Sequence, residues 1–256
     1  MIVGVISLLL SNQARAGERS SVTAFNGLPT PPDLIQIYAH RAVRGLLPEH
    51  TLPAYAAALR IGCDYVDMDV NMTKDGVLVV THDLGLNPDL TKDVSGQWVT
   101  ERIPIRSLTF EDLKRYNVGQ LNKETPYGKL FPHQMPLDSA FIPSLREVIR
   151  YVKDIARNRV GFQIEIKNDP SHPELSATPR EYAQTLHSIL VEEMILDRTE
   201  IQAFDWNCLV ELNAIDPGIK TAYLTDRTTV SPNVKKTKFW TAGLDPADFG
   251  HSLPQM

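Results

Sequence analysis

An alternation of short apolar runs with helix signals constrains the fold of this chain most strongly. Six runs have the length and composition of strands: 34–39, 65–72, 77–81, 160–167, 200–204 and 219–224. Strands that alternate with helices are typical of βαβ units and a parallel sheet. We therefore predict an α/β fold, a (β/α)8 TIM barrel. A closed barrel needs about eight strands, and residues 227–256 give no further strand–helix pattern, so the chain resembles a truncated barrel that lacks its C-terminal strands.

Helix boundaries support this alternation. Thr51 begins a predicted helix that has proline in its first turn, and Gly62 ends it. Ser144 and Thr178 are each followed by glutamate at the third position, the pattern of a capping box, and Asp205 caps another short helix. The helices expected from these signals lie between the predicted strands.

Residues 84–142 interrupt the alternation. They carry scattered proline, asparagine, aspartate and glycine, with one helix expected at 109–116 behind the pair Thr109 and Asp112. Segments of this length without strong periodicity are uncommon and are often functional. We predict an insertion after the third strand.

The N-terminal residues predict an exported protein. Ile2–Leu10 is a short apolar run, and Ala14–Ala16 supplies an A-x-A cleavage signature. We expect a signal peptide at 1–16, a lead-in at 17–34, a barrel domain at 35–256 and a periplasmic or secreted location. The alternative is an apolar segment that packs on the domain. The run is shorter than the roughly 20 residues that span a bilayer, and no other stretch is a transmembrane candidate.

Charge and cysteine content exclude several classes of function. The formal net charge of −5 disfavours nucleic acid as a partner. Cys63 and Cys208 have no neighbours at zinc-ligand spacing, so we expect two free thiols. Phosphate-loop, dinucleotide and nucleophile-elbow fingerprints are absent from the sequence. The sequence does not determine the oligomeric state.

Carboxylates are expected to share one face of the sheet. Alternate side chains of a strand point the same way, so Asp67 and Asp69 share a face while their apolar neighbours pack on the other side. Glu165 and Lys167 repeat this design in 160–167. Three oxygen ligands at the mouth of a barrel suit a hard divalent cation, Mg²⁺ or Ca²⁺. The alternative is a structural ion-pair network with Arg41 and Lys167.

Two histidines directly follow predicted strands. His40 follows 34–39 and His82 follows 77–81, which suits paired acid–base chemistry because imidazole titrates near neutral pH. Arg41 and Lys167 add positive charge suited to a phosphate. The five other histidines are expected at the surface or in the core, with His50 a candidate exception because of its location.

Taken in order, these motifs resemble the glycerophosphodiester phosphodiesterase family. The matching pieces are His40-Arg41, Gly45-Leu-Leu-Pro-Glu-His-Thr51, Asp67-x-Asp69, Thr73-Lys-Asp-Gly76, His82-Asp83, Asn87-Pro-Asp-Leu-Thr91, Ile142-Pro-Ser-Leu145, Glu165-x-Lys167 and Ala203-Phe-Asp205. Each piece is weak alone, whereas the ordered set is specific and spans about residues 35 to 226.

The resemblance implies a TIM barrel that hydrolyses small-molecule glycerophosphodiesters to an alcohol and glycerol 3-phosphate with a divalent metal. It implies that His40 and His82 act as general acid and base and that Arg41 and Lys167 hold the phosphate. Glu49 would support the metal or the glycerol. The implied metal ligands are Asp67, Asp69 and Glu165.

Three substitutions depart from the family pattern. Ala42 stands where the family has glycine, His50 where asparagine is usual, and Asp67 where glutamate is usual. The family's later Trp-Thr-x-Asn and Thr-Asp strands have no counterpart. Two alternatives therefore remain: an inactive, truncated barrel that binds phosphodiesters, and a phospholipase-type phosphodiesterase on the same fold.

Overall fold

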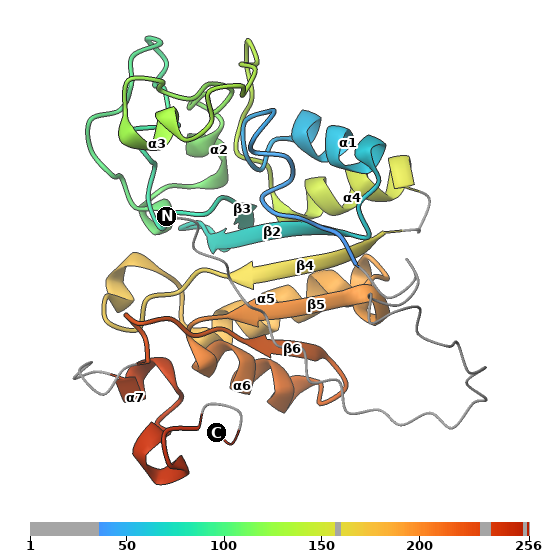
Figure 1. Cartoon of the computed structure of the whole chain (residues 1–256), viewed down its shortest axis with the longest axis vertical. Coiled ribbons are helices and arrows are strands. Elements are labelled where there is room, and N and C mark those ends of the chain that lie inside the picture. The colour runs from blue at the N-terminus through green and yellow to red at the C-terminus, as the bar shows by residue number, and fades with distance from the viewer. Residues whose placement is uncertain (1–35, 157–159, 231–236, 253–254, 256) are drawn as a thin grey trace, which may run out of the picture.

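The computed structural model describes residues 36–156, 160–230, 237–252 and 255 (Figure 1). The predicted signal peptide at 1–16 and the lead-in at 17–34 lie outside the described residues. The described chain forms one sheet with helices packed along it.

Five strands of the sheet are parallel, as predicted. Their order is β1-β2-β4-β5-β6, with bounds β1 Tyr38–Ala39, β2 Tyr65–Met72, β4 Gly161–Ile166, β5 Thr199–Ala203 and β6 Lys220–Tyr223. Strands β1 and β6 are the two edges of this order, so the sheet is open within the described residues. After β6 these residues form α7 (Thr237–Trp240) and the short helix η5 (Pro246–Phe249).

The third predicted strand runs in the opposite direction from the one expected. Strand β3 (Leu78–Val80) pairs antiparallel with β2, with Val80 opposite Val70. Only a tight turn joins β2 to β3, closed by a 3.0 Å hydrogen bond from Thr73 N to Val77 O. A parallel pair needs a crossover of about a dozen residues or more, so this short link allows only a hairpin.

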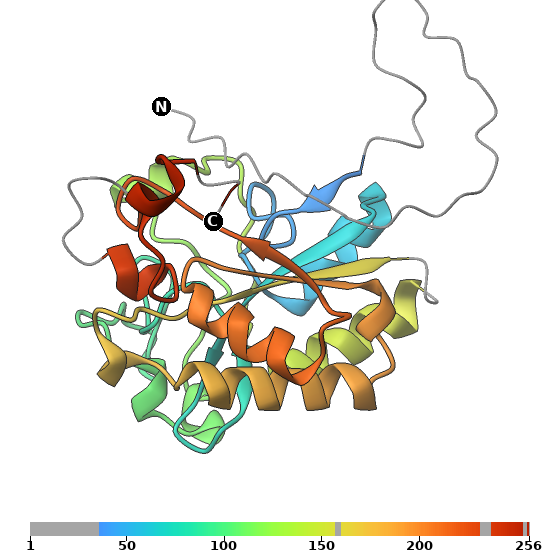
Figure 2. The same ribbon diagram turned by 90° about the horizontal axis from the view of Figure 1, so that it is seen from below.

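Four helices cover one face of the sheet: α1 (Leu52–Ile61), α4 (Leu145–Ala156), α5 (Pro179–Glu192) and α6 (Trp206–Ile215). Figure 2 shows α4, α5 and α6 lying along the same side. Two of the predicted caps are clear: Gly62 is left-handed at φ 97° after α1, and Thr178 and Glu181 form a reciprocal capping box before α5. Thr51 precedes α1 without a side-chain cap, because its hydroxyl donates to Pro48 O instead.

The core lies between these helices and the apolar face of the strands. Val66, Met68 and Val70 of β2 are fully buried in it, together with Phe162 and Ile164 of β4. Because side chains alternate along a strand, the opposite face of β2 and β4 carries the polar residues. The packing of the helices thus fixes which face presents the charged groups.

Residues 84–142 build a separate layer above β2 and β3. They contain the short helices η2 (Ile105–Ser107), α2 (Phe110–Leu113) and α3 (Pro126–Lys129). The predicted capping box of Thr109 and Asp112 is present, but α2 is shorter than the expected 109–116. This layer has a small apolar cluster of its own, which includes Leu86 and Leu113.

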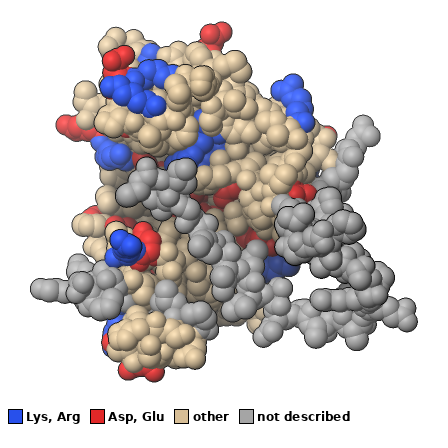
Figure 3. Space-filling model, viewed as in Figure 1, with Lys and Arg blue, Asp and Glu red and all other residues tan. Residues whose placement is uncertain are grey.

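Two surface properties bear on function. No helix in the described part of the chain is long and apolar enough to cross a membrane. Over the described part of the face in Figure 3, charged side chains of both signs are scattered, and no broad basic area stands out.

Candidate active site

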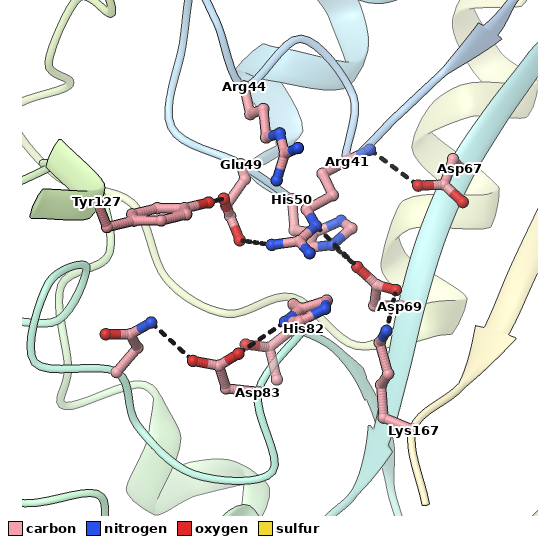
Figure 4. Close-up of polar contacts among 12 residues, drawn as sticks. Arg41, Arg44, Glu49, His50, Asp67, Asp69, His82, Asp83, Tyr127 and Lys167 are labelled. Atoms are coloured by element: carbon pink, nitrogen blue, oxygen red, sulfur yellow. Dashed lines mark hydrogen bonds and ion pairs between the residues drawn. The ribbon is translucent and has the colours of Figure 1, made fainter. Parts of the chain in front are cut away.

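Charged residues of β2 and β4 meet on the polar face of the sheet (Figure 4). The parallel register places Asp67 beside Gln163 and Asp69 beside Glu165. All three predicted acids are buried. Adjacent strands therefore bring together the carboxylates that the alternation pattern placed on one face.

The loop after β1 carries Arg41 into this cluster. Arg41 N donates to Asp67 Oδ2 at 2.9 Å, and its guanidinium pairs with Glu49 at 3.1 Å and with Asp69 at 3.5 Å. Arg41 Nε is buried and has no hydrogen-bond partner among the described residues. The same Nε lies 3.5 Å from Asp69 Oδ2, an ion pair without a hydrogen bond, so its N–H can still donate to an anion that enters the site.

The same loop contains backbone of left-handed conformation. Arg41 has φ 51°, Ala42 has φ 63° and His50 has φ 57°. This conformation costs a residue other than glycine about 1–2 kcal/mol. Ala42, where the family pattern has glycine, is thus a buried site of local strain, and such strain is concentrated at functional sites.

Lys167 follows β4 and points back to the acids. Its Nζ lies 3.2 Å from Asp69 Oδ1 and donates a short hydrogen bond to Glu165. Although burial acts in the opposite direction, Lys167 and His50 hold the pKa of Asp69 well below its ordinary value. The alternative of an ion-pair network therefore describes the side chains as they lie here.

The other two acids, Asp67 and Glu165, have raised pKa values. Burial, with the nearby charge of Asp69, raises the pKa of Asp67 to about 6. Burial raises the pKa of Glu165 to about 7, although Lys167 opposes the shift. Among the described residues no group of three or more His, Cys, Asp or Glu is arranged so that it could hold a metal ion. Buried carboxylates of raised pKa nevertheless fit a hard cation by donor chemistry.

His82 reaches the cluster because β3 folds back along β2. Thr81 N donates to Asp69 O at 2.9 Å, which brings the next residue to the level of Asp69. His82 Nδ1 lies 2.6 Å from Asp83 Oδ1, and Asp83 Oδ2 accepts from Asn87 and Arg102. Burial lowers the pKa of His82 despite the hydrogen bond to Asp83. The imidazole is thus held at one nitrogen and neutral near pH 7, which leaves Nε2 free to accept a proton.

His40 lies at the end of β1, as predicted. The residue is exposed, yet partial burial of its ring and the charges of Arg44 and Arg41 lower its pKa to about 4. It also lies close enough to Asp69 for electrostatic interaction. His40 thus borders the cluster.

Two residues of the cluster were not among the predicted site residues. His50 Nε2 lies 2.8 Å from Asp69 Oδ2, and its Nδ1 lies 2.9 Å from the Tyr55 hydroxyl. Tyr127 of α3 donates to Glu49 Oε2. The location of His50 within the Gly45–Thr51 motif was a signal, whereas Tyr127 belongs to residues 84–142 and to no motif.

Known proteins of one family resemble this chain. The model described as the glycerophosphoryl diester phosphodiesterase family matches residues 40–253. The glycerophosphodiester phosphodiesterase of Bacillus subtilis (strain 168) is 30% identical over 76% of this chain and 61% of the relative. The corresponding protein of Bacillus altitudinis is 29% identical over 75% of this chain and 67% of the relative. The chain thus spans about three fifths to two thirds of the length of these relatives.

Solved structures agree. A crystal structure from Silicibacter pomeroyi DSS-3, of a protein named as a glycerophosphoryl diester phosphodiesterase, has a TM-score of 0.72 and 30% identity over 81% of this chain and 69% of that chain. An Oleispira antarctica phosphodiesterase in complex with the product sn-glycerol-3-phosphate has a TM-score of 0.58 and 20% identity over 86% of this chain and 80% of that chain. The first similarity confirms the predicted class of α/β TIM-barrel fold, and the second concerns the fold alone.

Proposed function

Because this chain belongs to the glycerophosphoryl diester phosphodiesterase family, we propose that it hydrolyses glycerophosphodiesters to an alcohol and glycerol 3-phosphate. One observation carries the proposal. Arg41 and Lys167 approach the same carboxylate, that of Asp69, from different loops at 3.5 and 3.2 Å. We propose that these two cations, which converge on one buried point, bind the phosphate of the substrate.

Phosphate binding would use donors that the site already presents. Arg41 Nε makes no hydrogen bond among the described residues, and a phosphodiester oxygen can accept from it. The ammonium of Lys167 has three N–H donors and can contact phosphate while it stays close to Asp69. The anionic ligand would thereby offset two buried positive charges.

The finer proposal assigns acid–base catalysis to His82 and His40. His82 is held at Nδ1 by Asp83, so its Nε2 is the nitrogen that can exchange a proton with substrate. One imidazole takes the proton of a glycerol hydroxyl as the hydroxyl oxygen attacks phosphorus. The other, protonated when the anionic phosphate lies beside it, gives its proton to the alcohol oxygen as the bond from phosphorus to that oxygen breaks. Water then opens the cyclic phosphate with the two roles reversed.

We propose that Asp67, Asp69 and Glu165 hold a divalent cation, Mg²⁺ or Ca²⁺. Their burial and the raised pKa values of Asp67 and Glu165 support this assignment. When bound, the cation supplies Lewis-acid stabilisation of charge on the phosphate. Its positive charge would also free Lys167 from Glu165 and let the ammonium face the substrate.

The test is release of glycerol 3-phosphate from glycerophosphocholine, measured with a coupled dehydrogenase. We expect release in the presence of Mg²⁺ or Ca²⁺, loss on chelation with EDTA, and a fall of about 100-fold or more in kcat for His40→Ala. His172→Ala is the matched control, because His172 is an exposed histidine whose ion pair is with Glu174, outside the cluster.

The outcomes separate the parts of the proposal. Absence of glycerol 3-phosphate release from any glycerophosphodiester contradicts the activity. Release that persists under EDTA contradicts the cation, and full activity of His40→Ala contradicts the role of that histidine. Release of long-chain products from phospholipids would favour the phospholipase-type alternative.

A further inference from the structure

We infer that a cavity beside His82 binds the alcohol head group of the substrate and favours a head group that carries a carboxylate. The inference rests on the proposed function and specifies its substrate class. The cavity has a volume of about 340 Å³ and is lined by His82, Asp83, Leu84, Arg102, Pro104 and Leu175. Small-molecule pockets range from about 300 to 1,000 Å³, so the space suits a head group.

The position of the cavity follows from the two sides of the phosphate site. In Figure 4, Glu49 and Tyr127 lie beside Arg41, whereas His82 and Asp83 lie below them, with Asp83 on the far side of His82 from Asp69. The Glu49 side is the one assigned above to glycerol or metal support. A phosphodiester that lies between Arg41 and Lys167 therefore directs its second arm past His82 into the cavity.

Charge in the cavity comes from Arg102. Its Nη1 donates to Asp83 Oδ2 at 2.7 Å, and its side chain is 58% exposed. No other hydrogen bond of this guanidinium is found within the described chain. A guanidinium has five N–H donors in a planar fork that matches a carboxylate, so Arg102 retains donors for a ligand anion.

The other lining residues disfavour a cationic head group. Both oxygens of Asp83 are already engaged, Oδ1 with His82 and Oδ2 with Asn87 and Arg102. No Phe, Tyr or Trp side chain is among the described residues that line the cavity. A quaternary ammonium is usually recognised by such aromatic rings. The free donors therefore select for negative charge.

A matched pair of substrates tests the inference. Glycerophosphoserine differs from glycerophosphoethanolamine only by its carboxylate. We expect wild-type kcat/KM to be about tenfold higher for glycerophosphoserine, the advantage that one charge-assisted contact of about 1.4 kcal/mol provides. Arg102→Gln should bring the ratio of the two kcat/KM values close to one, whereas Arg102→Lys should keep part of the preference.

The ratio of the two kcat/KM values is the informative quantity. Loss of Arg102 also removes a hydrogen-bond partner of Asp83, which can lower kcat/KM equally for both substrates. Arg115→Gln is the control, since Arg115 is an exposed arginine in the same 84–142 segment that does not line the cavity. Its ratio should equal that of the wild type. A wild-type ratio of one, or a ratio that survives Arg102→Gln, overturns the inference and leaves the hydrolysis of glycerophosphodiesters intact.

Binding gives a readout that is independent of turnover. O-phosphoserine and O-phosphoethanolamine present the same phosphate with and without the carboxylate, and calorimetry can compare their Kd values in the presence of Mg²⁺. We expect about tenfold tighter binding of O-phosphoserine, lost in Arg102→Gln. If the chain hydrolyses no glycerophosphodiester but shows this preference, the proposed activity fails and the cavity assignment stands. Equal Kd values for the two ligands overturn the cavity assignment.

Discussion

Asp83→Asn should change the chemistry of His82 while it preserves the shape of the site. Asn87 and Arg102 both donate to one oxygen of Asp83, so they would hold the amide oxygen of the new asparagine. Its NH₂ group would then face His82 Nδ1, where the wild type has an acceptor. An NH₂ group can only donate, so the imidazole proton must move from Nδ1 to Nε2.

The expected changes in kcat and in stability follow from the contacts that Asp83→Asn removes and those that it keeps. A protonated Nε2 cannot accept a proton from substrate, so we expect kcat to fall by about 100-fold or more, the range of general acid–base catalysis. The side chain of Asp83 is 21% exposed. The asparagine that replaces it would still hydrogen-bond to His82, Asn87 and Arg102. The exposed pair with Arg102 contributes less than about 1 kcal/mol. We therefore expect the free energy of unfolding to fall by only about 1–2 kcal/mol.

The pH dependence of this loss has a definite sign. Burial alone would raise the pKa of Asp83, but His82 and Arg102 hold it well below the ordinary 3.8. The carboxylate therefore stabilises the folded state above the unfolded pKa, and this contribution disappears as pH falls through the folded pKa. The stability difference between wild type and Asp83→Asn should be full at pH 7 and should narrow below about pH 4.

Three measurements check this prediction. Glycerol 3-phosphate release gives kcat, urea unfolding gives stability, and ¹⁵N NMR of the imidazole identifies the protonated nitrogen. Asp138→Asn, at an exposed position of the 84–142 segment, should leave all three unchanged. An unchanged kcat in Asp83→Asn, or an imidazole that keeps its proton on Nδ1, would refute the reasoning.

Three further predictions follow from the core and the site. Ca²⁺ or Mg²⁺ at about a hundred times its Kd should add about 2.7 kcal/mol to the stability of the wild type, which is measured as a higher Tm. Glu165→Gln should show a smaller rise in Tm, and an equal rise would contradict Glu165 as a ligand of the cation. Met68→Ala, in the fully buried core, should cost about 2–5 kcal/mol, whereas Met135→Ala at an exposed position should stay within about 0.5 kcal/mol. Tyr127→Phe should lower stability by about 1–3 kcal/mol, because the Glu49 carboxylate loses its donor; unchanged urea unfolding would show that this contact contributes nothing.

Local signals predicted much of the fold because they depend on neighbours in sequence. The capping box before α5 and the left-handed Gly62 after α1 follow from short-range hydrogen bonding. The alternation in β2 identified the polar face correctly, since the apolar partners of Asp67 and Asp69 are buried in the core. The direction of β3 was predicted wrongly, because an apolar run does not encode the orientation of its partner and the short turn at Thr73 was given too little weight.

The structure brings the predicted acids together with Arg41 and Lys167, whereas most of their individual contacts were not predictable from the sequence. Motif spacing identified Asp69 and Lys167, yet it could not show that the ammonium lies directly against the carboxylate. Tyr127 was missed because its contact with Glu49 is made by tertiary packing of residues 84–142, a segment without strong periodicity. Such a contact depends on how a long segment folds back, and this has no local signature.

The pairing of β2 with β4 also determines when the site can form. These neighbours in the sheet are separated in sequence by the whole 84–142 segment, so their contact closes a long loop. Contacts of high sequence separation form slowly, because the entropy of loop closure is lost before the contact contributes stability. The hairpin of β2 and β3, which places His82 beside Asp69, is local and can form early. Glu165 and Lys167 can join this hairpin only after the chain between β3 and β4 has collapsed. Substrate affinity should therefore be acquired late in refolding.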